Sequence, residues 1–199
     1  MTHRSKYLPA ILGVVLVAGL SVPAFAGWKL IEANKPLTVN AITLTPTSNW
    51  NRASAKPGKF GVSLTHDGFG LDGLEIFSGL PAGQPLYRER SAKRNPMPKF
   101  DATMLPTDLA DFFERSFRVS NEITDFTVEK VTPSDFGGHR GIALRYRYSL
   151  TEGNLVRQGV ARLAIVKGKL YAANFYAPRL HYFPAHLPEV EAMLDGARF

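Results

Sequence analysis

The chain has 199 residues, of which 45% are hydrophobic and 21% are charged, and its formal net charge at pH 7 is +7. These proportions are typical of one globular domain and argue against a collagen-like fibre, a disordered chain or a protein with several membrane spans. The chain contains no cysteine, which excludes disulfides, thiol catalysis, iron–sulfur clusters and cysteine-based zinc sites.

The first 26 residues have the three parts of a secretory signal peptide. Arg4 and Lys6 give a basic start without acids, an apolar run covers residues 7–25, and Ala24-Phe25-Ala26 forms a small-residue cleavage site. We therefore predict cleavage after Ala26 and a periplasmic location, which suits a protein without cysteine. The alternative is an uncleaved N-terminal membrane anchor, because the run is almost long enough to span a bilayer.

Strand patterns dominate the next part of the chain. A linker is predicted over residues 27–36, followed by a single domain over residues 37–199. β-branched and alternating runs predict strands over 37–46, 58–65 and 71–80. Trp50 lies in a predicted loop and is expected to pack inward, and His66-Asp67-Gly68 is a turn signal.

A polar segment over residues 86–100 is predicted to be a surface loop, which we call the basic loop. Its only acid is Glu89. Its cations are Arg88, Arg90, Lys93, Arg94 and Lys99. A helix is predicted over residues 108–119, with Thr107 as its N-cap and acidic residues in its first turn. The apolar stripe of this helix consists of Leu109, Phe112, Phe113 and Phe117, which is typical of a face turned to the core.

The second half of the chain predicts a β meander and a closing helix. Alternating runs predict strands over 125–132, 140–150, 155–166 and 169–177, with hairpin turns at 151–154 and 167–168. The closing helix is predicted from Ala185 or Leu187 to Leu194, with Gly196 as its C-cap. Both faces of the predicted sheet carry apolar groups. The predicted fold class is therefore α+β, an antiparallel β-sheet with helices packed on one or both faces.

The hairpin turns predict which meander side chains share a face. Pairing Leu150 with Leu155 places Tyr148 opposite Arg157, and pairing Val166 with Lys169 places Arg162 opposite Ala173. Alternation then gives one core face: Ile142, Leu144, Tyr146, Tyr148, Leu163, Ile165, Leu170 and Tyr176. The other face collects Arg145, Arg147, Gln158, Val160, Arg162, Tyr171 and Phe175. This second face is either half-covered or the wall of a cleft, and a slip of one residue would exchange the two sets.

The order of the elements, with strands, a helix, a three-stranded meander and a C-terminal helix, resembles the PsbP-like fold, named for an extrinsic subunit of photosystem II. The phrases VTPSDFGGHRGIALRYRYSL (131–150), GKLYAANFYAP (168–178) and HYF (181–183) are also similar to an uncharacterised family of exported proteobacterial proteins. The resemblance covers most of residues 37–195. It implies an α/β/α sandwich, an exported location and a non-enzymatic assembly or binding role. None of these phrases is a catalytic signature, so the resemblance supplies no site residues.

The residues that carry chemistry form no recognised motif. Two histidine groups are candidates for a metal site, His66 with Asp67 and Asp72, and His181 with His186 and Glu189. Neither has a ligand spacing such as H-E-x-x-H, and the chain contains no G-x-S-x-G nucleophile elbow. The glycine-dense segment 135–141 is interpreted as a tight strand connection rather than an anion cradle. The sequence alone therefore assigns no catalytic residue, no metal ligand and no cofactor.

Three functions stay open at this point. The first is an exported, non-enzymatic accessory or interaction module whose basic loop contacts an envelope protein or an anionic surface. The second is a small-ligand or anion-binding protein that uses the second meander face. Its candidate binding residues are Arg145, Arg147, Gln158, Arg162 and Tyr171. The third is a hydrolase or metal-dependent enzyme.

Two further expectations concern partners. Nucleic acid is not an expected partner, because alternation sends the arginines and tyrosines of residues 145–148 to opposite faces and export separates the chain from nucleic acid. Insertion into a membrane is expected only through an unprocessed signal segment.

Overall fold

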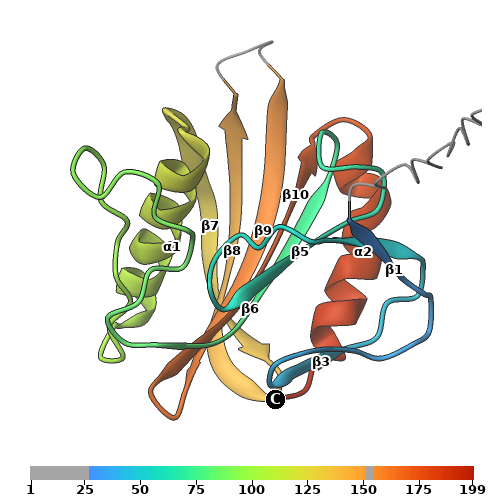
Figure 1. The fold of residues 1–199 in the computed structure, drawn as a ribbon, viewed down its shortest axis with the longest axis horizontal. Coiled ribbons are helices and arrows are strands. Elements are labelled where there is room, and N and C mark those ends of the chain that lie inside the picture. The colour runs from blue at the N-terminus through green and yellow to red at the C-terminus, as the bar shows by residue number, and fades with distance from the viewer. Residues whose placement is uncertain (1–26, 151–154) are drawn as a thin grey trace, which may run out of the picture.

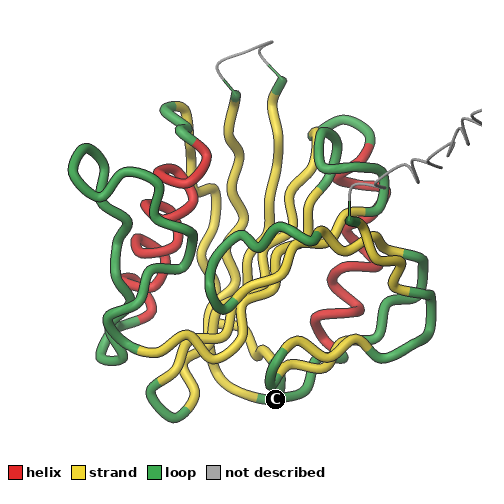
Figure 2. The backbone as a smooth tube through the Cα atoms, viewed as in Figure 1, coloured by secondary structure: helices red, strands yellow, loops and turns green. Residues whose placement is uncertain are grey.

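The computed structural model describes residues 27–150 and 155–199, so the predicted signal peptide and the predicted 151–154 turn lie outside the described residues. An eight-stranded antiparallel sheet runs through the molecule in the order β1-β4-β5-β6-β10-β9-β8-β7 (Figure 1). Its strands are β1 (Trp28–Ile31), β4 (Trp50–Ala53), β5 (Gly61–Thr65), β6 (Gly73–Pro81), β7 (Asp125–Phe136), β8 (His139–Ser149), β9 (Val156–Val166) and β10 (Lys169–Pro178). A separate hairpin consists of β2 (Leu37–Val39) and β3 (Ile42–Leu44). The helices α1 (Pro106–Asn121) and α2 (Tyr182–Asp195) lie on opposite sides of the sheet (Figures 1 and 2).

Helix α1 covers the meander face that was predicted to be the core face. Pro106 fits the first turn, where its missing N–H needs no helical partner, and the Asp108 carboxylate accepts the N–H of Leu105 at 2.9 Å. The helix therefore begins before the predicted Thr107 cap, because Asp108 completes the capping from inside the first turn. It ends at Glu122, which adopts the left-handed conformation with φ 54°. The predicted apolar stripe is confirmed, because Leu109, Phe112, Phe113 and Phe117 are all buried.

Helix α2 and the β2–β3 hairpin cover the opposite face of the sheet. Phe183 of the helix stacks on Phe175 of β10, with ring centroids 5.7 Å apart. The helix begins three residues or more before its predicted start, because Pro184 falls in the first turn, where a proline costs no hydrogen bond. Its predicted cap residue, Gly196, is confirmed. Among the described residues, no helix is both long enough and apolar enough to cross a membrane.

Three short elements differ from the sequence prediction. Residues 27–36 contain strand β1, which pairs with β4, so part of the predicted linker belongs to the sheet. The run 37–46 is a hairpin rather than one strand, because Asn40 adopts φ 50° and reverses the chain between Val39 and Ile42. Trp50, which was expected in a loop, begins strand β4 and is fully buried as predicted.

The predicted registers of the meander are confirmed. Tyr148 pairs with Arg157 across β8 and β9, and Arg162 pairs with Ala173 across β9 and β10. Because β8 pairs with β9 and β9 pairs with β10 in the predicted registers, the side chains that were assigned to each face lie on the predicted sides of the sheet. One core cluster lies between the sheet and α1, and the other lies between the sheet, α2 and the β2–β3 hairpin. This three-layer arrangement confirms the α+β fold class with an antiparallel sheet.

Candidate functional site

The turn between β5 and β6 positions the first pair of functional side chains, His66 and Asp67. The Asp72 carboxylate accepts the backbone N–H groups of His66 at 2.8 Å and Asp67 at 2.9 Å. The same carboxylate accepts the hydroxyl of Thr65 at 2.6 Å. Asp72 is fully buried, so these bonds fix the turn from its inner side.

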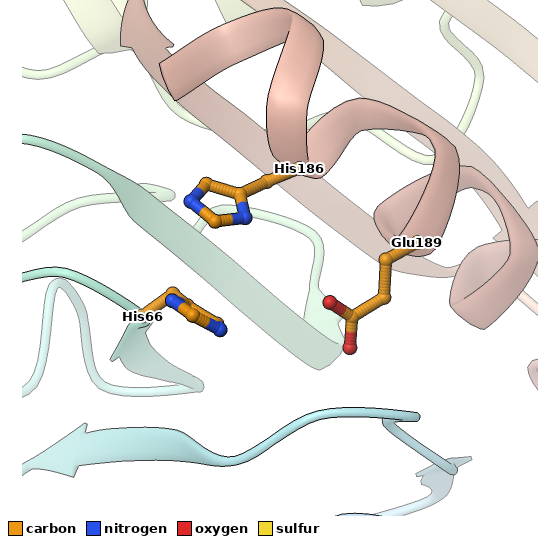
Figure 3. Close-up of side chains that lie close together, drawn as sticks. All are labelled: His66, His186 and Glu189. Carbon is orange, nitrogen blue, oxygen red and sulfur yellow. The ribbon is translucent and has the colours of Figure 1, made fainter. Parts of the chain in front are cut away.

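Helix α2 brings His186 and Glu189 to the same place. The two residues are three positions apart, so they lie on one face of the helix. The imidazoles of His66 and His186 have centroids 4.4 Å apart, and one ligating atom of His66, His186 and Glu189 lies within 4.8 Å of the other two. Figure 3 shows these three side chains facing one another across the space between α2 and the chain segment that carries His66. We call His66, Asp67, His186 and Glu189 the histidine site.

Asp67 holds both imidazoles of the histidine site. Its Oδ2 lies 2.5 Å from Nε2 of His186, and its Oδ1 lies 3.2 Å from Nδ1 of His66. Burial acts to raise the pKa of Asp67, but the hydrogen bonds and charges of the two histidines outweigh it and lower the pKa. Asp67 is therefore ionised at neutral pH and orients both rings.

Glu189 is held from the loop between β3 and β4. Its Oε1 accepts the N–H groups of Thr47 at 3.2 Å and Ser48 at 2.8 Å, together with the indole N–H of Trp50 at 3.3 Å. The Ser48 hydroxyl lies 2.8 Å from Oε2. Burial opposes ionisation, but the bonds from Ser48, Trp50 and Thr47 prevail and lower the pKa of Glu189. The site therefore presents a fixed carboxylate to two imidazoles.

The histidine site combines parts of the two groups that the sequence suggested separately. His66 and Asp67 come from the first group, and His186 and Glu189 come from the second. His181 is exposed and lies outside the cluster, and Asp72 acts on the backbone of the turn. No sequence spacing joins His66 with His186, because the contact depends on how α2 packs against the sheet.

The basic loop is anchored from within the protein. Leu86, Tyr87, Met97 and Phe100 are buried, and the Tyr87 hydroxyl donates a 2.6 Å hydrogen bond to the buried carboxylate of Glu75. The backbone closes the base of the loop, because Phe100 donates its N–H to the carbonyl of Gln84 at 3.0 Å. At Gly58, a side chain would place its Cβ 2.1 Å from the Leu86 carbonyl oxygen, so glycine allows the loop to pass this close.

The cations of the basic loop remain free for a partner. Arg88, Arg90, Lys93, Arg94 and Lys99 are all exposed. Within residues 27–150 and 155–199, none of these side chains lies within 4.0 Å of a carboxylate oxygen. The one acid of the loop, Glu89, accepts the N–H of Met97 at 3.1 Å. Lys56 and Lys59, which the sequence prediction did not include, line a hollow of 320 Å³ together with Arg88 and extend the positive surface.

The arginines of the second meander face have acidic neighbours. Arg145 lies 3.8 Å from Glu191, Arg162 lies 2.5 Å from Asp195, and Arg147 lies 3.6 Å from Glu129. Arg145 and Arg162 line a hollow of 210 Å³ beside α2, whereas Arg147 and Gln158 form a cross-strand pair outside it. Tyr171 stacks on Phe199 with ring centroids 4.3 Å apart. Of the five candidate residues, the structure gathers only Arg145 and Arg162 around one hollow.

The sheet order and the helix on each face define the chain as a PsbP-like α/β/α sandwich. The solution structure of cyanobacterial PsbP (CyanoP) from Synechocystis sp. PCC 6803 is similar with a TM-score of 0.54 and 14% identity, over 94% of this chain and 98% of that chain. This likeness confirms the fold that the element order predicted.

Two other solved structures are less similar. PA94, a protein of unknown function from Pseudomonas aeruginosa, has a TM-score of 0.41 and 11% identity over 82% of this chain and 95% of its own. LpqN, involved in cell envelope biogenesis of Mycobacterium tuberculosis, has a TM-score of 0.36 and 8% identity over 89% of this chain and 86% of its own. No family model matches the chain, and neither does any curated protein.

Proposed function

We propose that this chain is an exported, non-enzymatic accessory module that attaches to an anionic surface of the cell envelope through its basic loop. The observation that carries this proposal is that the loop is fixed at its base while its cations pair with no carboxylate of residues 27–150 and 155–199. Tyr87, Met97 and Phe100 hold the loop in the core, and the Glu89 carboxylate accepts a hydrogen bond from the backbone N–H of Met97. An ordered segment that exposes an excess of positive charge attracts a negatively charged surface.

The distribution of the cations favours a membrane surface over a shaped protein pocket. Lys56, Lys59 and Arg88 share one hollow with the acid Glu89, whereas the other four cations of the loop are exposed to solvent outside it: Arg90, Lys93, Arg94 and Lys99. Such a diffuse arrangement gains about 1 kcal/mol for each Lys or Arg near an anionic bilayer and needs no precise stereochemistry. We therefore take anionic lipid headgroups as the surface that the loop contacts.

Export of the chain has its own test. Expression of the full chain in a Gram-negative host is expected to give a periplasmic product that begins at Gly27, because A-F-A at residues 24–26 fits the signal peptidase site. Intact-mass measurement of the fractionated protein gives the cleavage position. A cytoplasmic product that retains residues 1–26 contradicts export, and a full-length product in the membrane fraction supports the uncleaved anchor.

Attachment to an anionic surface is tested with the chain of residues 27–199 and lipid vesicles. The variant Arg90→Glu/Lys93→Glu/Arg94→Glu reverses three charges in the basic loop. At about 1 kcal/mol for each cation, we expect its binding to phosphatidylglycerol-containing vesicles to weaken at least about 100-fold. Co-sedimentation over a series of lipid concentrations measures this change.

A control variant separates the loop from the net charge. Lys29, Lys130 and Lys169 are exposed and lie on strands outside the loop. Lys29→Glu/Lys130→Glu/Lys169→Glu changes the net charge by the same amount and is expected to retain most of the binding. An equal loss of vesicle binding in the two variants would show that net charge alone, and not the basic loop, determines the binding. Absence of vesicle binding by the unaltered protein would overturn the lipid proposal and leave an acidic protein as the partner to seek.

A further inference from the structure

We propose that the histidine site binds one zinc ion, with His66, His186 and Glu189 as its ligands and Asp67 as the carboxylate that orients both histidines. This proposal is independent of the basic loop. The three ligands come from the β5–β6 turn and from α2, which are far apart in the sequence. The ion would therefore connect the sheet to α2.

The geometry of the three side chains suits a small tetrahedral ion. Their ligating atoms lie within 4.8 Å of one another, and ligands bound at about 2.0 Å to a tetrahedral zinc lie about 3.3 Å apart. The groups therefore need to approach by about 1.5 Å at most. Small rotations of the two imidazoles about their side-chain torsions would bring their free nitrogens toward the Glu189 carboxylate, which Thr47, Ser48 and Trp50 hold in place.

Hydrogen bonding leaves one nitrogen of each imidazole available, and Oε2 of Glu189 accepts a hydrogen bond only from the Ser48 hydroxyl among the described residues. Asp67 occupies Nδ1 of His66 and Nε2 of His186, and the opposite ring nitrogens make no hydrogen bond within the described part of the chain. Histidines that bind a metal ordinarily donate their second N–H to a carboxylate, which fixes the tautomer and raises the basicity of the ligating nitrogen. One aspartate does this here for both rings.

The kind of ligand selects the class of metal. Two imidazoles and one carboxylate suit zinc and similar transition metals, whereas magnesium and calcium prefer sites made of oxygen alone. The protein contributes three ligands in this arrangement, so a fourth position is open to water. The partly exposed imidazoles of His66 and His186 give an ion access from solvent.

The test is isothermal titration calorimetry, in which zinc chloride is added to the untagged chain of residues 27–199. We expect one ion to bind per chain. His186→Gln and Glu189→Gln are expected to lose this binding, and Asp67→Asn is expected to weaken it about 10- to 100-fold because the rings lose their orienting partner. Magnesium and calcium chloride are expected to give no saturable binding.

The matched control is His181→Gln, which makes the same chemical change at an exposed position beside α2. It is expected to bind zinc as the unaltered protein does. Unaltered protein supplies a second readout that needs no variant, because zinc is expected to protect His66 and His186 from acylation by diethyl pyrocarbonate. No saturable zinc binding, or an equal loss in His181→Gln and His186→Gln, would overturn the proposal.

Discussion

Replacing Phe117 by alanine is expected to lower the free energy of unfolding by about 3–5 kcal/mol, the usual cost of removing a buried phenylalanine. Phe117 is 1% exposed and lies at the centre of the aromatic cluster that joins α1 to the sheet. Its ring centroid lies 5.4 Å from that of Tyr148, 5.5 Å from Tyr146 and 5.6 Å from Tyr176. Each of these rings would border the cavity left by the substitution, so the lost contacts cannot be replaced by one side chain moving inward.

Urea unfolding followed by circular dichroism measures this effect. Leu180→Ala is the control, because Leu180 is 92% exposed and its removal is expected to change stability by less than about 0.5 kcal/mol. The leucine of Phe117→Leu fills most of the cavity, so its loss in free energy of unfolding is expected to lie between the losses of Phe117→Ala and Leu180→Ala. A loss of less than about 1 kcal/mol in Phe117→Ala would show that α1 packs more loosely than the structure indicates.

The second large effect concerns pH and the buried carboxyl of Glu75. Glu75 accepts hydrogen bonds from the Tyr87 hydroxyl at 2.6 Å and from the Asn174 amide at 3.0 Å. Burial raises the pKa of Glu75 to about 7, although these two bonds act in the opposite direction. In the unfolded chain the pKa is near 4.5, so between pH 4.5 and pH 7 the folded state binds more protons than the unfolded state.

This difference sets the sign of the expected pH dependence. Glu75 contributes most to the free energy of unfolding below its unfolded pKa. This contribution is lost as the pH rises through the folded pKa, and the total change is about 3 kcal/mol. Glu75→Gln cannot ionise and retains an acceptor for Tyr87. The stability of this variant relative to the unaltered protein is therefore expected to increase from pH 5 to pH 8.

Measuring the two proteins side by side isolates Glu75 from the other carboxyls. Asp67 and Glu189 have lowered pKa values and change stability with the opposite sign, but they are the same in both proteins. Urea unfolding at several pH values gives the difference directly. Parallel stability curves for the two proteins would show that Glu75 titrates in the folded state as it does in the unfolded chain.

Regular alternation and turn length made the meander predictable from the sequence. A two-residue turn at Lys167-Gly168 fixes which residues pair, and with it the face of every side chain in β9 and β10. The short N-terminal elements were less predictable, because their strand character depends on distant partners. Strand β1 is defined by pairing with β4, and Asn40 reverses the chain within a run that alternates as one strand does.

The sequence suggested the residues of the histidine site in two separate groups, but their combination could not be predicted, because the two groups meet only through tertiary packing. The contact between Asp67 and His186 joins residues 119 positions apart. The exposure of the basic loop followed from its composition, but its anchoring did not. Nothing near Tyr87 in the sequence indicates that its hydroxyl reaches Glu75 or that Gly58 passes against Leu86.

The salt dependence of vesicle binding tests the central claim most directly. If exposed cations of the basic loop hold the protein on an anionic bilayer, binding of residues 27–199 to phosphatidylglycerol-containing vesicles must weaken steadily as salt is added, because ions screen charges exposed to solvent. The account predicts a steep dependence for the unaltered protein and for the Lys29/Lys130/Lys169 control. It predicts weak binding with little salt dependence for the Arg90/Lys93/Arg94 variant. Salt-independent binding of the unaltered protein, or identical salt dependence in all three proteins, would contradict it.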